Sequence, residues 1–205
     1  MKIAIIGHGN VGGALAQRWA AAGHQIVIGA RNPEDEKVGR LTGASDRISA
    51  ASIPAAVEAA EVILISTPAQ IVADLAGQIG PATGKVFLDA TNAVWKKPEP
   101  YPNGLAALKA LTGATDVAKA FNTTGFENMA DPQYGSQAAD LFVAGDSQRA
   151  KEIATQLAKD AGFGEVYDFG GDDKAPLIEQ FALAWINLAI MQGYGRNIAF
   201  KVLTR

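Results

Sequence analysis

Short apolar runs alternate with segments of helical periodicity along most of this chain. The runs cover residues 2–6, 25–28, 60–65, 85–89 and 116–121, and a further short strand is predicted over 46–51. Between them, residues 14–19 and 70–79 show the spacing of helices. Continuous apolar strands separated by helices are typical of a parallel sheet that is covered by helices on both faces.

The last third of the chain predicts a smaller unit. Strands are expected over 141–145 and 164–169, with a helix over 148–161 between them and a long apolar helix near the end. The proline-rich stretch 95–103 is predicted to be a surface loop. The fold class is therefore α/β: a doubly wound (Rossmann-type), mostly parallel sheet with a small C-terminal α/β addition and a long terminal helix. The expected division is a dinucleotide-binding domain over 1–122 and a C-terminal subdomain over 123–205.

The first strand leads directly into a glycine-rich turn that opens a helix. The turn consists of Gly7, His8, Gly9, Asn10, Val11 and Gly12. In this strand–turn–helix context, the first glycine permits a tight turn and the second lets a pyrophosphate approach the backbone. The third lets the helix and strand pack closely, and the N–H groups of the first helical turn face the anion. These six residues are predicted to bind the dinucleotide.

The end of the second strand indicates which dinucleotide is bound. NAD sites place a carboxylate here to bind the ribose 2′-hydroxyl, whereas this chain has Arg31 and Asn32, followed by Lys37. A guanidinium can make paired hydrogen bonds to a 2′-phosphate, which a carboxylate would repel. Residues 31, 32 and 37 are therefore predicted to select NADP. The alternative is that Arg31 is an ordinary surface charge balanced by the acidic residues 34–36.

Three later strands end in polar clusters. Because ligands of a doubly wound sheet lie at the carboxyl ends of its strands, the clusters are expected to surround the nicotinamide half of the cofactor. The site residues predicted there are Ser66, Thr67, Pro68, Asn92 and Asn122. Ordinary turn chemistry is the alternative for each one alone, since Ser, Thr and Asn commonly end strands.

No residue is assigned a catalytic role. His8 either reaches toward the nicotinamide or points to solvent, and His24 is expected to cap the end of the first helix. Asp89 is interpreted as a carboxylate held by backbone N–H groups, and Glu179 as either ion-paired or pocket-lining. The glycines of 193–195 are expected to permit close approach of the backbone, either to a helix of a partner subunit or to a second ligand.

Composition excludes several kinds of chemistry. The 205 residues include no cysteine and two histidines, which excludes disulfides, thiol catalysis and cysteine-ligated metals and predicts no metal site. A net charge of -3 provides no electrostatic basis for binding nucleic acid or an acidic membrane. With no leader pattern or membrane span recognised, a cytoplasmic location is expected.

The chain resembles the NADPH-dependent deazaflavin reductases, the 8-hydroxy-5-deazaflavin:NADP oxidoreductase group, over nearly its full length. The resemblance rests on the glycine turn, Gly29-Ala30-Arg31, Leu177-Ile178-Glu179 and Gly193-Tyr194-Gly195. It implies direct hydride transfer between NADP(H) and a second bound cofactor, with no acid, base or metal supplied by the protein. It also implies a homodimer in which residues 123–205 complete the second pocket. The same nucleotide-binding unit occurs in membrane metalloreductases.

The identity of the electron acceptor stays open at this point. Residues 122–129 differ from the histidine- and proline-containing stretch of the deazaflavin enzymes, so a deazaflavin, a flavin and a ferric chelate reduced through flavin are all candidates. Two other functions are considered. One is an NADPH-binding sensor or regulatory module without turnover, and the other is an NADPH-dependent imine or carbonyl reductase.

Overall fold

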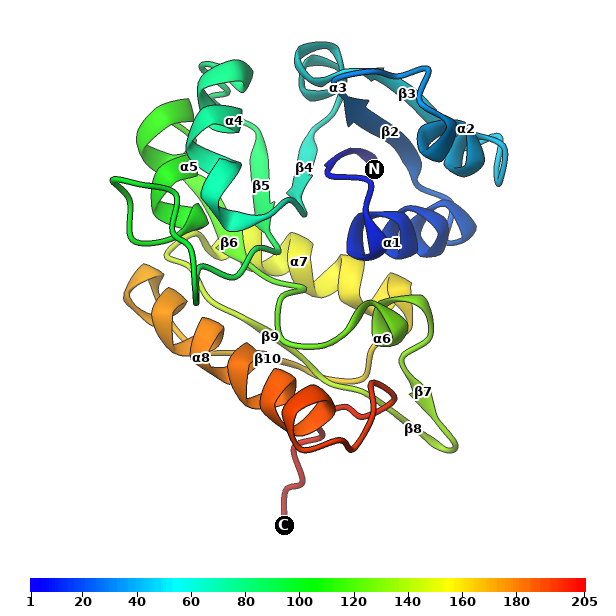
Figure 1. Ribbon diagram of the computed structural model, residues 1–205, viewed down its shortest axis with the longest axis vertical. Helices are drawn as coiled ribbons and strands as arrows, with labels where there is room; N and C mark the ends of the chain where they lie inside the picture. Colours follow the sequence, from blue (N-terminus) through cyan, green and yellow to red (C-terminus); the bar gives the residue numbers. More distant parts are fainter.

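A computed structural model describes all residues from Met1 to Arg205 and contains a six-stranded parallel sheet at its centre (Figure 1). The strand order β3-β2-β1-β4-β5-β6 is that of a doubly wound dinucleotide-binding fold, which confirms the predicted fold class. The strands are β1 (Lys2–Ile6), β2 (Gln25–Ala30), β3 (Ile48–Ser52), β4 (Val62–Ile65), β5 (Val86–Asp89) and β6 (Asp116–Lys119).

Helices cover both faces of this sheet. One face packs on α1 and α7 through the larger apolar cluster, and the other packs on α3, α4 and α5. This coverage explains why the strands are apolar on both sides. The helices are α1 (Asn10–Ala21), α2 (Glu36–Thr42), α3 (Ile53–Ala59), α4 (Val72–Ile79), α5 (Gly104–Thr112), α6 (Phe126–Ala130), α7 (Gln148–Ala161) and α8 (Ala175–Ile186). Neither α2 nor α3 was predicted from the sequence pattern, because each is only 7 residues long.

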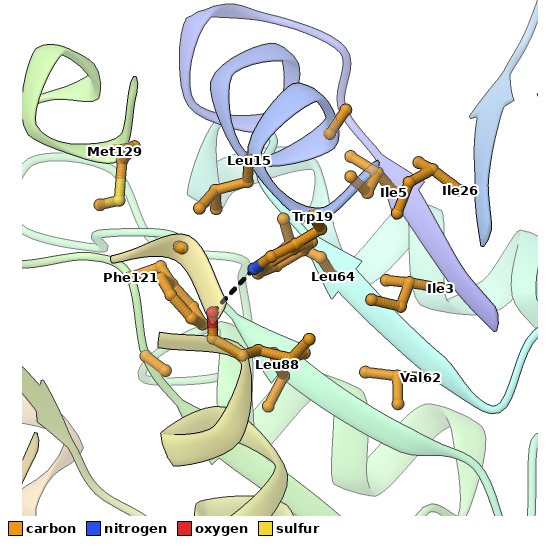
Figure 2. Packing of buried hydrophobic residues seen from close by; sticks show 14 of the residues in the cluster. Ile3, Ile5, Leu15, Trp19, Ile26, Val62, Leu64, Leu88, Phe121 and Met129 are labelled. Atoms are coloured by element: carbon orange, nitrogen blue, oxygen red, sulfur yellow. Dashed lines mark hydrogen bonds between the residues drawn. The ribbon is translucent and has the colours of Figure 1, made fainter. Parts of the chain in front are cut away.

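Trp19 of α1 is at the centre of the larger core cluster. Its indole N–H donates to the carbonyl oxygen of Leu157 at 2.9 Å, and its ring meets Phe121 edge-on at 5.4 Å (Figure 2). The hydrogen bond satisfies a polar atom that would otherwise be buried without a partner. It also fastens α1 to α7, so the helix that begins at the glycine turn is held by the C-terminal part of the chain.

The C-terminal part adds a small parallel pair, β9 (Leu141–Val143) with β10 (Val166–Asp168), and a hairpin of β7 (Gln133–Tyr134) with β8 (Gln137–Ala138). An antiparallel bridge between Lys119 and Ala144 connects the pair to the edge of the main sheet. The terminal helix α8 lies across the lower part of the view in Figure 1 and continues as a π-helical turn over Asn187–Met191.

Two features singled out in the sequence lie at the ends of helices. Gly193 and Gly195 follow the terminal helix with φ of 76° and 82°, and no atom lies within 4 Å of the Cβ that either lacks. They therefore turn the chain out of the helix, and the expected approach to a partner subunit or a second ligand stays a prediction. His24 caps the end of α1 through its backbone, because its N–H donates to the carbonyl oxygen of Trp19 at 2.9 Å. Its ring has a second role, since Nε2 lies 2.9 Å from the carboxylate of Asp160 on α7.

Candidate functional site

A cavity of about 470 Å³ opens at the carboxyl edge of the sheet, between the ends of β1 and β4. The strand order reverses at β1, which has β2 on one side and β4 on the other, so this is where a doubly wound sheet binds its ligand. Of the predicted site residues, the following line the cavity: Gly7, His8, Gly9, Arg31, Lys37, Ser66, Thr67 and Pro68.

The glycine turn forms one wall of the cavity, and two of its glycines are required for its shape. Gly7 has φ of 105°, and a Cβ there would lie 2.6 Å from the carbonyl oxygen of Ser66. A Cβ on Gly12 would overlap the carbonyl oxygen of Gly7. Gly9 differs, because no atom lies within 4 Å of its missing Cβ. The open space over Gly9 is where a phosphate group can approach the backbone.

Helix α1 begins at this turn with its N-terminus uncapped. Gly9 is the N-cap residue and has no side chain to accept from the first N–H groups, and no acidic residue lies in the first turn. Ser66 closes the turn from the β4 side, since its hydroxyl donates to the carbonyl oxygen of Gly7 at 2.7 Å. Free N–H groups at a helix start attract anions, so the turn fits a pyrophosphate.

Arg31 and Lys37 bring positive charge to the β2 end of the cavity. Both side chains are exposed, and neither makes a hydrogen bond or an ion pair with the protein. Two of the neighbouring acids are already engaged: Asp35 accepts from the backbone N–H of Lys37 at 2.9 Å, and Glu36 pairs with Arg40. The positive charge is therefore available to a 2′-phosphate.

Helix α4 and the turn before it, Ala69–Ile71, supply a wall of the cavity that was not predicted from the sequence. Ile71, Asp74, Leu75 and Gln78 line the cavity opposite Ile53 at the start of α3. Their spacing of three to four residues places them on one helical face, which is the signal that the sequence contained. Its apolar members, Ile71 and Leu75, were missed because apolar residues on a helix are also what a buried core requires.

The remaining predicted residues lie around the cavity without lining it. Asn92 and Asn122 form a reciprocal pair: the Asn92 amide donates to the Asn122 backbone carbonyl at 2.9 Å, and the Asn122 amide donates to Asn92 Oδ1 at 2.9 Å. The turn into Asn122 passes through Phe121, whose φ of 59° is strained for a residue with a side chain. The others outside the lining are Asn10, Val11, Gly12 and Asn32.

Polar atoms without partners are concentrated at the same edge. His8 Nδ1, Thr67 Oγ1, Thr91 Oγ1 and Asn122 Oδ1 are buried and have no hydrogen-bond partner in the protein. Buried polar groups in folded proteins normally have a partner. His8 and Thr67 both line the cavity, and their free atoms fit a polar nucleotide.

A buried ion triad of Asp89, Lys119 and Glu179 lies behind this edge. The Lys119 ammonium is 2.7 Å from Asp89 Oδ2 and 2.8 Å from Glu179 Oε1, and it donates to the Thr91 carbonyl at 2.7 Å. Burial lowers the pKa of Lys119, whereas the two carboxylates raise it. Their combined effect is the larger one, so the pKa of Lys119 lies above its ordinary value. Asp89 also accepts from the Thr91 N–H at 2.9 Å, as expected from the sequence. Of the two roles considered for Glu179, ion pairing is the one that the structure shows. Lys119 was not singled out in the sequence, because it lies inside an apolar run.

Strand order, glycine turn and basic strand end together define a nicotinamide-dinucleotide-binding protein of the doubly wound α/β class. The family model described as "NADP oxidoreductase coenzyme F420-dependent" matches residues 2–93. The chain is 32% identical to the F420-dependent NADP reductase of Methanothermobacter marburgensis, over 98% of each chain. It therefore belongs to the coenzyme F420-dependent NADP oxidoreductase family, and it is an NADP-dependent oxidoreductase.

Two other relatives extend the comparison. A crystal structure from Arthrobacter sp. FB24, described as an F420-dependent NADP-reductase, superposes with a TM-score of 0.82 at 27% identity and 100% coverage of both chains. The metalloreductase STEAP3 of Rattus norvegicus is 27% identical over 79% of this chain and 32% of its own. None of the helices in this chain is long and apolar enough to cross a membrane.

Proposed function

We propose that this protein transfers a hydride between NADP(H), held in the cavity between β1 and β4, and a deazaflavin bound beside it. The observation that carries the proposal is the combination of an open glycine turn with unpaired Arg31 and Lys37 at the end of β2. The family to which the chain belongs, and a relative named as an F420-dependent NADP reductase across 98% of both chains, support the choice of acceptor.

The proposed cofactor contacts divide into three groups along the edge of the sheet. The glycine turn, residues 7–12, receives the pyrophosphate at the start of α1. Arg31, Asn32 and Lys37 receive the 2′-phosphate. The nicotinamide half is placed over the ends of β4, β5 and β6, with these residues around it: Ser66, Thr67, Pro68, Asn92 and Asn122.

The chemistry requires alignment more than proton transfer. The bound cofactors supply the hydride and its acceptor, and the protein holds the two rings face to face and excludes water. We propose that residues 1–122 bind NADP and that residues 123–205 complete the second pocket. The hydrogen bond from Trp19 on α1 to Leu157 on α7 supports this arrangement, because it holds residues 123–205 against the helix that begins at the glycine turn.

The direct test follows oxidation of NADPH at its near-ultraviolet absorption band with deazaflavin, FMN, FAD and a ferric chelate offered separately. We expect turnover with deazaflavin, and a much weaker reaction when NADH replaces NADPH. Turnover with flavin or ferric chelate alone would contradict the deazaflavin assignment. If NADPH bound without oxidation by any acceptor, the hypothesis of an NADPH-binding sensor without turnover would replace the proposed reaction.

We further propose that the protein is a homodimer that associates through the terminal helix and the tail. Large apolar side chains remain exposed there, including Ile190 at 55%, Met191 at 63% and Tyr194 at 72%. Exposed apolar side chains that lie this close together in the sequence favour association with a second copy. Sedimentation analysis should give twice the mass of the chain for the wild type and a monomer for Met191→Lys. A monomeric wild type would contradict this proposal. We also propose a cytoplasmic location, because NADPH is an intracellular reductant.

A further inference from the structure

The ion triad carries an unbalanced charge. It consists of two carboxylates, Asp89 and Glu179, and one ammonium, Lys119, so one negative charge remains. The side chains of Asp89 and Lys119 are 0% exposed and that of Glu179 is 6% exposed, so water does not screen this charge effectively. The start of α5 at Gly104 lies beside the Asp89 carboxylate, and its partial positive charge helps to stabilise the excess.

Along the carboxyl edge of the sheet, the triad lies on the β5 and β6 side of β1, whereas Arg31 lies on the β2 side. Asp89 and Lys119 end β5 and β6, and they continue a row of register partners that starts with Ile65 at the end of β4. The next residue after Ile65 is Ser66, which lines the cavity. With the pyrophosphate at the end of β1 and the 2′-phosphate at the end of β2, the nicotinamide half extends over this row.

We propose that the triad's excess negative charge selectively stabilises the oxidised cofactor, so that Glu179 and Asp89 set the relative affinity of the site for NADP⁺ and NADPH. This inference rests on the proposed function, since it needs NADP(H) in the cavity. The oxidised nicotinamide ring carries a positive charge and the reduced ring is neutral, so the attraction acts on one state alone. Tighter binding of the oxidised form makes bound NADPH the stronger hydride donor.

The test compares equilibrium dissociation constants of the acceptor-free protein for NADP⁺ and NADPH in the wild type and in Glu179→Gln. The substitution keeps the size of the side chain and removes one charge. We expect the ratio of the NADP⁺ constant to the NADPH constant to rise about tenfold, as for unit charges on the order of 10 Å apart in a protein interior. A tenfold change corresponds to about 30 mV in the potential of the bound two-electron couple.

A matched control removes the same charge elsewhere. Glu61 lies just before β4 at the amino edge of the sheet and accepts from the Lys2 N–H at 2.8 Å. Glu61→Gln should leave the ratio within about twofold of the wild type, because its charge is exposed and far from the carboxyl edge. If Glu179→Gln does not fold, Asp89→Asn makes the same charge change from β5.

The outcomes separate this inference from the proposed function. If both nucleotides bind and the charge-neutralising variant changes both constants equally, the triad has a structural role and the inference is overturned. If the wild type binds neither nucleotide, the proposed function itself is wrong. A rise in the ratio in the triad variants but not in Glu61→Gln supports the inference.

Discussion

Asp89 and Lys119 are partners twice over: their backbones are in register on the neighbouring strands β5 and β6, and their charged groups meet at 2.7 Å. Glu179 reaches the same ammonium from α8, so one buried lysine joins two strands of the sheet to the terminal helix. A lysine without these partners would not remain charged in this interior.

Replacing Lys119 with methionine should destabilise the protein strongly. The change leaves two buried carboxylates without their cation, and removal of one member of a buried ion pair costs about 3–5 kcal/mol. Urea unfolding followed by far-ultraviolet circular dichroism measures the free energy of unfolding. The exposed Lys97 provides the control, since Lys97→Met should change that free energy by less than about 0.5 kcal/mol. A loss below about 1 kcal/mol for Lys119→Met would contradict the prediction.

Two alanine substitutions in the glycine turn should affect different properties, one the stability of the fold and the other the affinity for NADPH. Gly12→Ala places a methyl group against the Gly7 carbonyl and should destabilise the fold by about 1–3 kcal/mol. Gly9→Ala meets open space and has a permitted φ of -74°, so the melting temperature should change little. Its methyl group should nevertheless obstruct the approaching phosphate and weaken NADPH binding at least tenfold. Unchanged NADPH affinity in Gly9→Ala would show that no phosphate approaches there.

Removing the charge of Arg31 should weaken NADPH binding much more than NADH binding. A hydrogen-bonded charge contributes roughly 1.5–3 kcal/mol, so Arg31→Ala is expected to raise the NADPH dissociation constant about 10- to 100-fold. Fluorescence titration with both nucleotides gives the comparison. Arg47 lies at the amino end of β3, and Arg47→Ala should leave both constants unchanged. Equal losses for NADPH and NADH in Arg31→Ala would contradict recognition of the 2′-phosphate.

The C-terminal tail should loosen at acidic pH. Burial raises the pKa of Asp140, whereas hydrogen bonds from Lys201 and from the N–H groups of Val202 and Glu165 lower it. The hydrogen bonds have the larger combined effect, so the pKa lies below its ordinary value of 3.8. A carboxyl whose pKa is lowered by folding contributes stability above its unfolded pKa, and this stability is lost as the pH falls through the folded value. Asp140→Asn should therefore cost about 2 kcal/mol at pH 7, with the difference shrinking below pH 3.8. A difference independent of pH would exclude ionisation of Asp140 as its cause.

The parts of the site that were predictable from sequence are those where local chemistry limits the residue type. Gly7 and Gly12 are required by the turn itself, and Arg31 follows a strand whose end is fixed by its apolar run. The doubly wound class was predictable for a similar reason, since strands that are apolar on both faces need helices on both sides.

The parts that could not be predicted depend on contacts between distant segments. Lys119 occupies a strand position that the apolar pattern predicts to be buried, and only its pairing with Asp89 and with Glu179 from the far end of the chain explains it. Ile71 and Leu75 carry no sign of whether their helix face meets the core or a ligand. Asn92 and Asn122 were correctly placed at the sheet edge, but their mutual pairing requires knowledge of the register between β5 and β6.

The position of β1 in the middle of the sheet also sets the order in which the cavity can be completed. During synthesis, β1, β2 and β3 can pair before β4 has emerged, because they are neighbours both in sequence and in space. That half-sheet already contains the glycine turn and Arg31, yet it lacks the opposite wall with Ser66 and Thr67. A ligand seated between the walls spans the join between an early half and a late half, so its binding opposes their separation and should stabilise the finished sheet.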